Sequence, residues 1–160
     1  MPRRLLLLAA LSLAITATLL VYYFAETRAT NYPTYGSVLQ ANGFQFQGGW
    51  VPKWLPASAS NIREVHDIDS GRQWLRFSIP RIHVPIFLAS SQPLPRAEAR
   101  RTGVKRPLRV GSGWPDELSR VPMATPRSSL EFRRLPDTPF CAAVDDSTGV
   151  IVAWTCAADS

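Results

Sequence analysis

The sequence predicts an α+β fold, in which an apolar amino-terminal helix precedes a small domain with an antiparallel sheet of short strands. Residues 5–24 form an uninterrupted uncharged run. Short alternating segments between turn residues follow, and 14 prolines forbid long regular elements. Two cysteines flank a turn-like segment, which predicts a disulfide hairpin.

The apolar segment, residues 1–24, predicts a transmembrane anchor. A helix over residues 5–24 is roughly 30 Å long, which matches the hydrocarbon core of a bilayer. A cleaved secretory signal is the alternative, but its apolar region usually has about 7 to 15 residues. Tyr22 and Tyr23 end the run and suit the membrane interface. No cysteine stands directly after the apolar run, which excludes a lipoprotein attachment of the usual bacterial type.

The basic residues predict the orientation of this anchor. Arg3 and Arg4 precede the run, whereas Glu26 and Arg28 nearly cancel after it. The positive-inside rule therefore places the amino terminus in the cytoplasm and residues 25–160 outside.

The remaining chain divides into a tether and a domain. Residues 25–43 are polar and turn-rich, which predicts a tether of low order, and residues 44–160 form the domain. We expect five or six short strands and at most two short helices. The strands lie at about 44–50, 62–67, 73–79 and 129–135 and in the terminal hairpin. A helix is expected at about 84–91, a capped helical turn near 58–60 and another turn at 115–120.

The terminal hairpin carries Cys141 and Cys156 around the sequence DDSTG. A two-residue loop at Thr148 and Gly149 makes the cysteines direct cross-strand partners, and a bridge forms in an oxidising compartment. Closing a loop of this size contributes about 3 kcal/mol. The alternatives are two unpaired buried thiols and, less favoured, a metal site.

A polar cluster, Glu64, His66, Asp67 and Asp69, presents two interpretations: a metal or acid/base site, or a polar hairpin tip. The run lacks the further ligands that calcium or zinc requires. Strand alternation directs Glu64 and His66 to one face and Asp67 to the other. We therefore expect a hydrogen-bonded turn with a cross-strand ion pair, such as Glu64 with Arg76, and neither a metal nor another cofactor.

Enzyme motifs are not evident elsewhere. The sequence has no G-x-S-x-G elbow, and VGSGW at residues 110–114 lacks the lysine of a phosphate loop. A metal-dependent or hydrolytic enzyme that uses the polar cluster remains the alternative to a binding module.

Two candidate binding surfaces stand out. Residues 96–109 carry one glutamate and six basic residues, Arg96, Arg100, Arg101, Lys105, Arg106 and Arg109. They predict either a solvated loop or contact with anionic lipid or a cell-wall polymer. Nucleic acid is not expected, because aromatic residues do not interleave with these charges. Trp74 and Arg76 share a strand face that is either core or a contact surface for protein or glycan.

Residues 49–77 resemble a family of small bacterial envelope proteins. The matching pattern is W-V-P-x-x-L-P-x-S-A-x-x-I, followed by an H-D-x-D-like turn and by W-L-R-F. The resemblance implies a short protein of the Gram-negative envelope and assigns no activity. Together with the anchor, it predicts a single-pass inner-membrane protein whose periplasmic domain binds another envelope protein.

Overall fold

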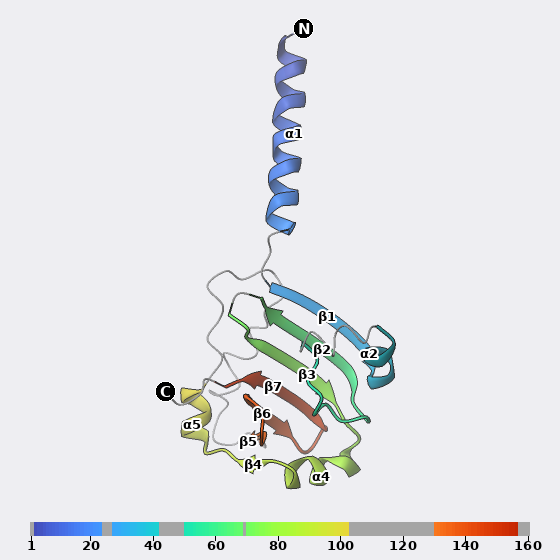
Figure 1. Cartoon of the computed structure of the whole chain (residues 1–160), viewed down its shortest axis with the longest axis vertical. Helices are drawn as coiled ribbons and strands as arrows, with labels where there is room; N and C mark the ends of the chain where they lie inside the picture. Colours follow the sequence, from blue (N-terminus) through green and yellow to red (C-terminus); the bar gives the residue numbers. More distant parts are fainter. Residues whose placement is uncertain (1, 24–26, 42–49, 69, 103–129, 157–160) are drawn as a thin grey trace.

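The computed structural model describes residues 2–23, 27–41, 50–68, 70–102 and 130–156. Its centre is an antiparallel seven-stranded sheet in the order β1-β2-β3-β7-β6-β5-β4 (Figure 1). The strands are β1 (Thr27–Thr34), β2 (Ser60–Asp67), β3 (Gln73–Ser78), β4 (Gln92–Pro93), β5 (Leu130–Arg134), β6 (Phe140–Asp145) and β7 (Val150–Thr155). The helices are α1 (Pro2–Tyr23), α2 (Tyr35–Ala41), α4 (Val84–Ala89), α5 (Arg96–Arg101) and the 3-10 helix η1 (Arg81–His83). The predicted α+β class with an antiparallel sheet is confirmed.

Both faces of the sheet are covered, because successive side chains of a strand point to opposite faces. One face packs Leu75 and Phe77 of β3 against α2, α4 and the segment 51–59. The opposite face packs Trp74 against Trp154, the disulfide and Ala99 of α5. The core therefore has two layers of side chains, one on each side of the sheet.

The predicted tether at residues 25–43 is wrong. Strand β1 pairs with β2 from Thr27 to Thr34, and α2 follows at once. Thr34 begins this helix, because its Oγ1 accepts a hydrogen bond from the Ser37 N–H at 3.2 Å. Tyr32 and Val38 are buried. An edge strand is held by one neighbour and needs few apolar residues, so its composition resembled that of a linker.

Helix α5 was also not predicted. The prolines at 107, 115, 122 and 126 predicted a loop over this part of the chain, but α5 ends before them, and Pro95 is the residue before its first turn. Ala99 is fully buried, and Glu98 Oε1 lies 2.6 Å from the Arg134 guanidinium of β5. The basic composition of this segment therefore accompanies a helix that packs on the sheet.

The two predicted hairpins, β2–β3 and β6–β7, are confirmed. The predicted register of the β6–β7 hairpin is corrected. Cys141 pairs with Trp154, and Asp145 pairs with Val150, so the turn has four residues rather than two. Asp145 accepts hydrogen bonds at its backbone oxygen from the N–H groups of Thr148 (3.3 Å) and Gly149 (2.8 Å), which stabilises this longer turn. Cys141 and Cys156 are diagonal partners, and the predicted disulfide forms across a Cα separation of 5.6 Å.

Helix α1 extends away from the sheet (Figure 1). Among the helices of the described residues, none is both long enough and apolar enough to cross a membrane, so the predicted transmembrane helix is not supported. The strand expected at 44–50 lies outside the described residues except for residue 50. The helical turn expected at 115–120 lies entirely outside them.

Candidate functional site

The polar cluster is divided by strand β2, as its alternation predicts. Glu64 and His66 lie on the face that carries Ile62, and His66 Nδ1 is 2.7 Å from Glu64 Oε1. The Glu64 side chain is fully buried. Its second oxygen, Oε2, has no hydrogen-bond partner within the described part of the chain. This contact is therefore an internal carboxylate–imidazole pair.

Trp50, which precedes strand β2, packs on the His66 member of this pair. Its ring stacks on the His66 imidazole with centroids 3.9 Å apart and planes inclined by 18°. Burial raises the pKa of the Glu64 carboxyl, and the hydrogen bond with His66 partly opposes this rise. Burial also raises the pKa of Tyr32, and the charge of Glu64 adds to that effect.

The acids of the cluster do not converge on one point. Asp67 Oδ1 accepts hydrogen bonds from the N–H (2.8 Å) and the hydroxyl (2.5 Å) of Ser70, so it closes the turn. Asp69 lies outside the described residues. Within the described ranges, no group of three or more His, Cys, Asp or Glu side chains can hold a metal ion.

The expected ion pair between Glu64 and Arg76 is wrong. Glu64 stands opposite Leu75, whereas Arg76 stands opposite Arg63 on the other face of the sheet. The register of the β2–β3 hairpin therefore directs these two side chains to different layers.

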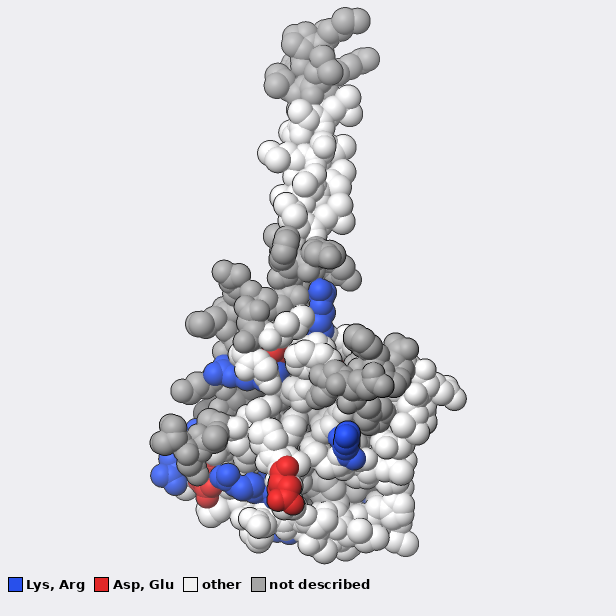
Figure 2. Space-filling model, viewed as in Figure 1, with Lys and Arg blue, Asp and Glu red and all other residues white. Residues whose placement is uncertain are grey.

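The two predicted binding surfaces are only partly described. Trp74 is fully buried beneath the Arg63 guanidinium, whose carbon lies 5.9 Å from the ring centroid, so Trp74 is not available to a partner. Arg96 packs over Phe132 at 5.4 Å, and Arg101 is exposed. The side chains of Arg100, Lys105, Arg106 and Arg109 are outside the described part. In Figure 2 the described Lys and Arg side chains lie at separate places on the face in view.

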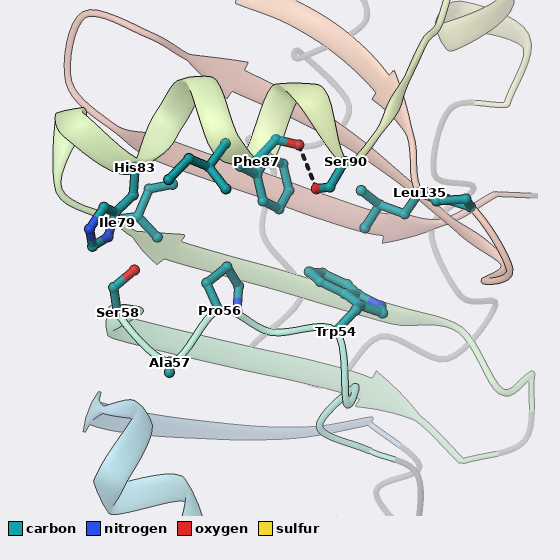
Figure 3. Close-up of a pocket in the computed structure, with 11 residues that line it drawn as sticks. Trp54, Pro56, Ala57, Ser58, Ile79, His83, Phe87, Ser90 and Leu135 are labelled. Atoms are coloured by element: carbon teal, nitrogen blue, oxygen red, sulfur yellow. Dashed lines mark hydrogen bonds between the residues drawn. The ribbon is translucent and has the colours of Figure 1, made fainter.

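A pocket of about 780 Å³ opens on the side of the sheet that carries Leu75 and Phe77. Helix α4 forms one wall and the segment from Trp54 to Ser58 forms the opposite wall (Figure 3). The lining is mainly apolar: Trp54, Pro56, Ala57, Ser58, Ile79, His83, Ile86, Phe87, Ser90, Leu135 and Pro136. His83 is the one titratable side chain among them.

Three separate parts of the sequence build this pocket. Two turns shape the wall formed by the segment from Trp54 to Ser58. One is closed by a hydrogen bond from the Leu55 N–H to the Pro52 oxygen (3.1 Å), and the other by a hydrogen bond from the Ala59 N–H to the Pro56 oxygen (2.9 Å). Arg133 holds the end of α4, because its guanidinium donates to the Leu88 oxygen. Sequence reasoning missed the pocket. The available signal was the pair of adjacent apolar residues Ile86 and Phe87 in the short predicted helix, of which Phe87 is buried and Ile86 stays 67% exposed.

A comparison with known families finds a match for the amino-terminal part of the sheet. Residues 26–78 match the model of the YbbD head domain family. The match covers about one third of the chain, from β1 to β3. It indicates a bacterial family. No curated protein and no solved structure matches the chain significantly.

Proposed function

We propose that this chain is a non-catalytic binding module of the bacterial cell envelope that recognises another envelope protein. The observation that carries the proposal is the open apolar pocket, whose lining residue Ile86 is 67% exposed. Exposed apolar surface beside a concave site is typical of an interaction site. The match to the YbbD head domain supports a place in the envelope.

The proposal includes attachment to the inner membrane through α1, with the sheet domain in the periplasm. The described side chains of α1 carry no charge, and seven large apolar residues are more than half exposed: Leu7, Leu8, Leu11, Leu13, Ile15, Leu19 and Leu20. A lipid environment removes such a surface from water. The disulfide suits an oxidising compartment. Alkaline extraction of membranes, together with protease digestion of spheroplasts, tests this placement.

Catalysis by the polar cluster is not proposed. The Glu64–His66 pair has the short contact of an acid/base dyad, but Glu64 is 0% and His66 6% exposed, and Trp50 covers the imidazole. A reacting group needs access to the acid or base that serves it. We infer that the pair stabilises the fold. Contact of the basic segment with anionic lipid or a cell-wall polymer is a secondary proposal that rests on its composition.

Substitution of Ile86 by Asp tests the binding function. The carboxylate stays hydrated on this exposed site, so the fold is retained, but it repels an apolar partner surface. We expect Ile86→Asp to reduce the yield of the cross-linked complex from intact membranes at least tenfold. Ile68→Asp is the matched control, because Ile68 is 51% exposed in the β2–β3 turn, away from the pocket. Equal loss in both variants, or no stoichiometric complex in the wild type, contradicts the proposal.

A further inference from the structure

We propose that the pocket binds an extended, uncharged apolar peptide segment of the partner, with the peptide backbone hydrogen-bonded to Ser58, His83 and Ser90. This inference rests on the proposed function and names the chemistry that enters the site. Nothing in the family match assigns it, because α4, Leu135 and Pro136 lie beyond residues 26–78.

The residues that line the pocket indicate that the bound peptide segment is uncharged. The lining contains no Lys, Arg, Asp or Glu, so a charged side chain inside the pocket loses its hydration and finds at most the His83 imidazole and two serine hydroxyls as polar partners. An isolated ion in an apolar site is strongly disfavoured. Apolar side chains, by contrast, gain free energy when the pocket removes them from water. The pocket therefore selects an uncharged stretch.

The positions of the polar groups favour a peptide over an acyl chain. Ser58 and His83 lie together at one end of the pocket, and Ser90 lies beside Phe87, toward the other end (Figure 3). Ser90 donates its hydroxyl proton to the Phe87 oxygen at 2.9 Å, so its oxygen remains an acceptor for a ligand N–H. An extended peptide presents N–H and C=O groups at every residue, whereas an acyl chain carries polar atoms only at its head.

Aromatic contacts and prolines support both walls of the pocket. The Trp54 ring meets Phe140 edge-on at 5.2 Å, and Phe87 meets Phe77 edge-on at 6.3 Å. Pro56 and Pro136 complete the lining with fixed backbone angles. Walls supported in this way lower the entropy lost on binding. Aromatic and proline surfaces are also typical of grooves that take extended peptides.

Site-specific photo-cross-linking tests the inference in the full chain in its native membrane. A photoreactive amino acid replaces Ala57, an exposed residue of the lining, or Ile68 as the control outside the pocket. We expect the probe at Ala57 to attach to one partner, within a stretch that has no charged residue near the attachment point. The probe at Ile68 should not label that stretch.

A synthetic peptide with the mapped sequence then provides a quantitative test. We expect it to bind the full chain, and an Asp at its central apolar position should weaken binding at least tenfold. Ser58→Ala and Ser90→Ala should each weaken binding roughly threefold to tenfold, as expected for the loss of one hydrogen bond. The melting temperature of each variant controls for folding.

The outcomes separate this inference from the proposed function. A partner that cross-links at Ala57 through a charged stretch, or a peptide unaffected by the central Asp, overturns the inference and leaves the binding function intact. A lipid adduct at Ala57 in place of a peptide also overturns the inference. The absence of any protein adduct at Ala57, together with no stoichiometric partner in membranes, overturns both.

Discussion

At the scale of single residues, the Glu64–His66 pair shows how a polar contact can belong to a core. Glu64 is fully buried, its hydrogen bond to His66 satisfies one of its two oxygens, and Trp50 stacks on the His66 ring. Removing one partner of such a buried pair leaves the other uncompensated, which commonly costs about 3 to 5 kcal/mol. The same chemistry that resembled a catalytic site in the sequence is thus a determinant of stability.

Glu64→Gln is expected to change the pH dependence of stability. The pKa of Glu64 is raised above its ordinary value of 4.5, so the folded state keeps this proton to higher pH than the unfolded chain does. The contribution of the protonated Glu64 carboxyl to the free energy of unfolding is full below about pH 4.5 and is lost as the pH rises through the raised pKa. The free energy of unfolding of the wild type should therefore fall relative to Glu64→Gln over that window.

Urea denaturation between pH 4 and pH 8 measures this difference. Glu131→Gln is the matched control, because the Glu131 side chain is 51% exposed on β5 and its contact with the Arg133 guanidinium is a long 3.8 Å. That control should follow the wild-type curve. Parallel curves for the wild type and Glu64→Gln would show that the carboxyl does not titrate with folding.

At the scale of secondary structure elements, several local signals predicted the elements that were found. Alternation of apolar and polar side chains predicted β3 and β5, the turn residues before β3 predicted β2 as its hairpin partner, and the two cysteines predicted the β6–β7 hairpin, whereas β1 and α5 were missed. Edge strand β1 has little apolar periodicity, and the six residues of α5 follow two prolines. The face shared by Glu64 and His66 followed from alternation alone. The stacking of Trp50 and the pocket required contacts between distant segments, which no local pattern encodes.

The β6–β7 turn makes a sharp prediction at this scale. Gly149 has φ +72° and Gly71 has φ +63°, so alanine is strained at both positions, by about 1 to 2 kcal/mol. A Cβ on Gly149 also lies 2.3 Å from the Ile79 oxygen, whereas a Cβ on Gly71 meets no atom within 4 Å. We expect Gly149→Ala to destabilise the chain by at least 2 kcal/mol more than Gly71→Ala.

Chemical denaturation of the two alanine variants isolates the clash from the backbone strain. The Ile79 N–H donates to the Gly149 oxygen at 2.9 Å, so a displaced turn also disturbs the residue that lines the pocket. Equal loss of stability in the two variants would show that the turn moves aside without cost.

At the scale of the whole molecule, the sheet consists of two halves that meet at one strand pair. The family match ends at Ser78, so it contains β1, β2 and β3 but not β7. Strand β3 pairs with β7 from Trp74 opposite Trp154 to Ser78 opposite Val150. The pocket also draws one wall from each half, because Trp54 lies inside the matched residues and Phe87 outside them.

This division predicts that residues 26–78 do not fold alone, whereas residues 26–160 do. Without β7, the inner edge of β3 is unpaired, and the fully buried side chains of Trp74, Leu75 and Phe77 lose their cover. A chain this short also buries too little surface to tolerate that loss. Circular dichroism and amide dispersion by NMR should show an unfolded or aggregated short fragment and a cooperatively folded long one. A monomeric 26–78 fragment with a cooperative unfolding transition would instead make the matched segment an autonomous domain, and the β3–β7 pairing an interface between two domains.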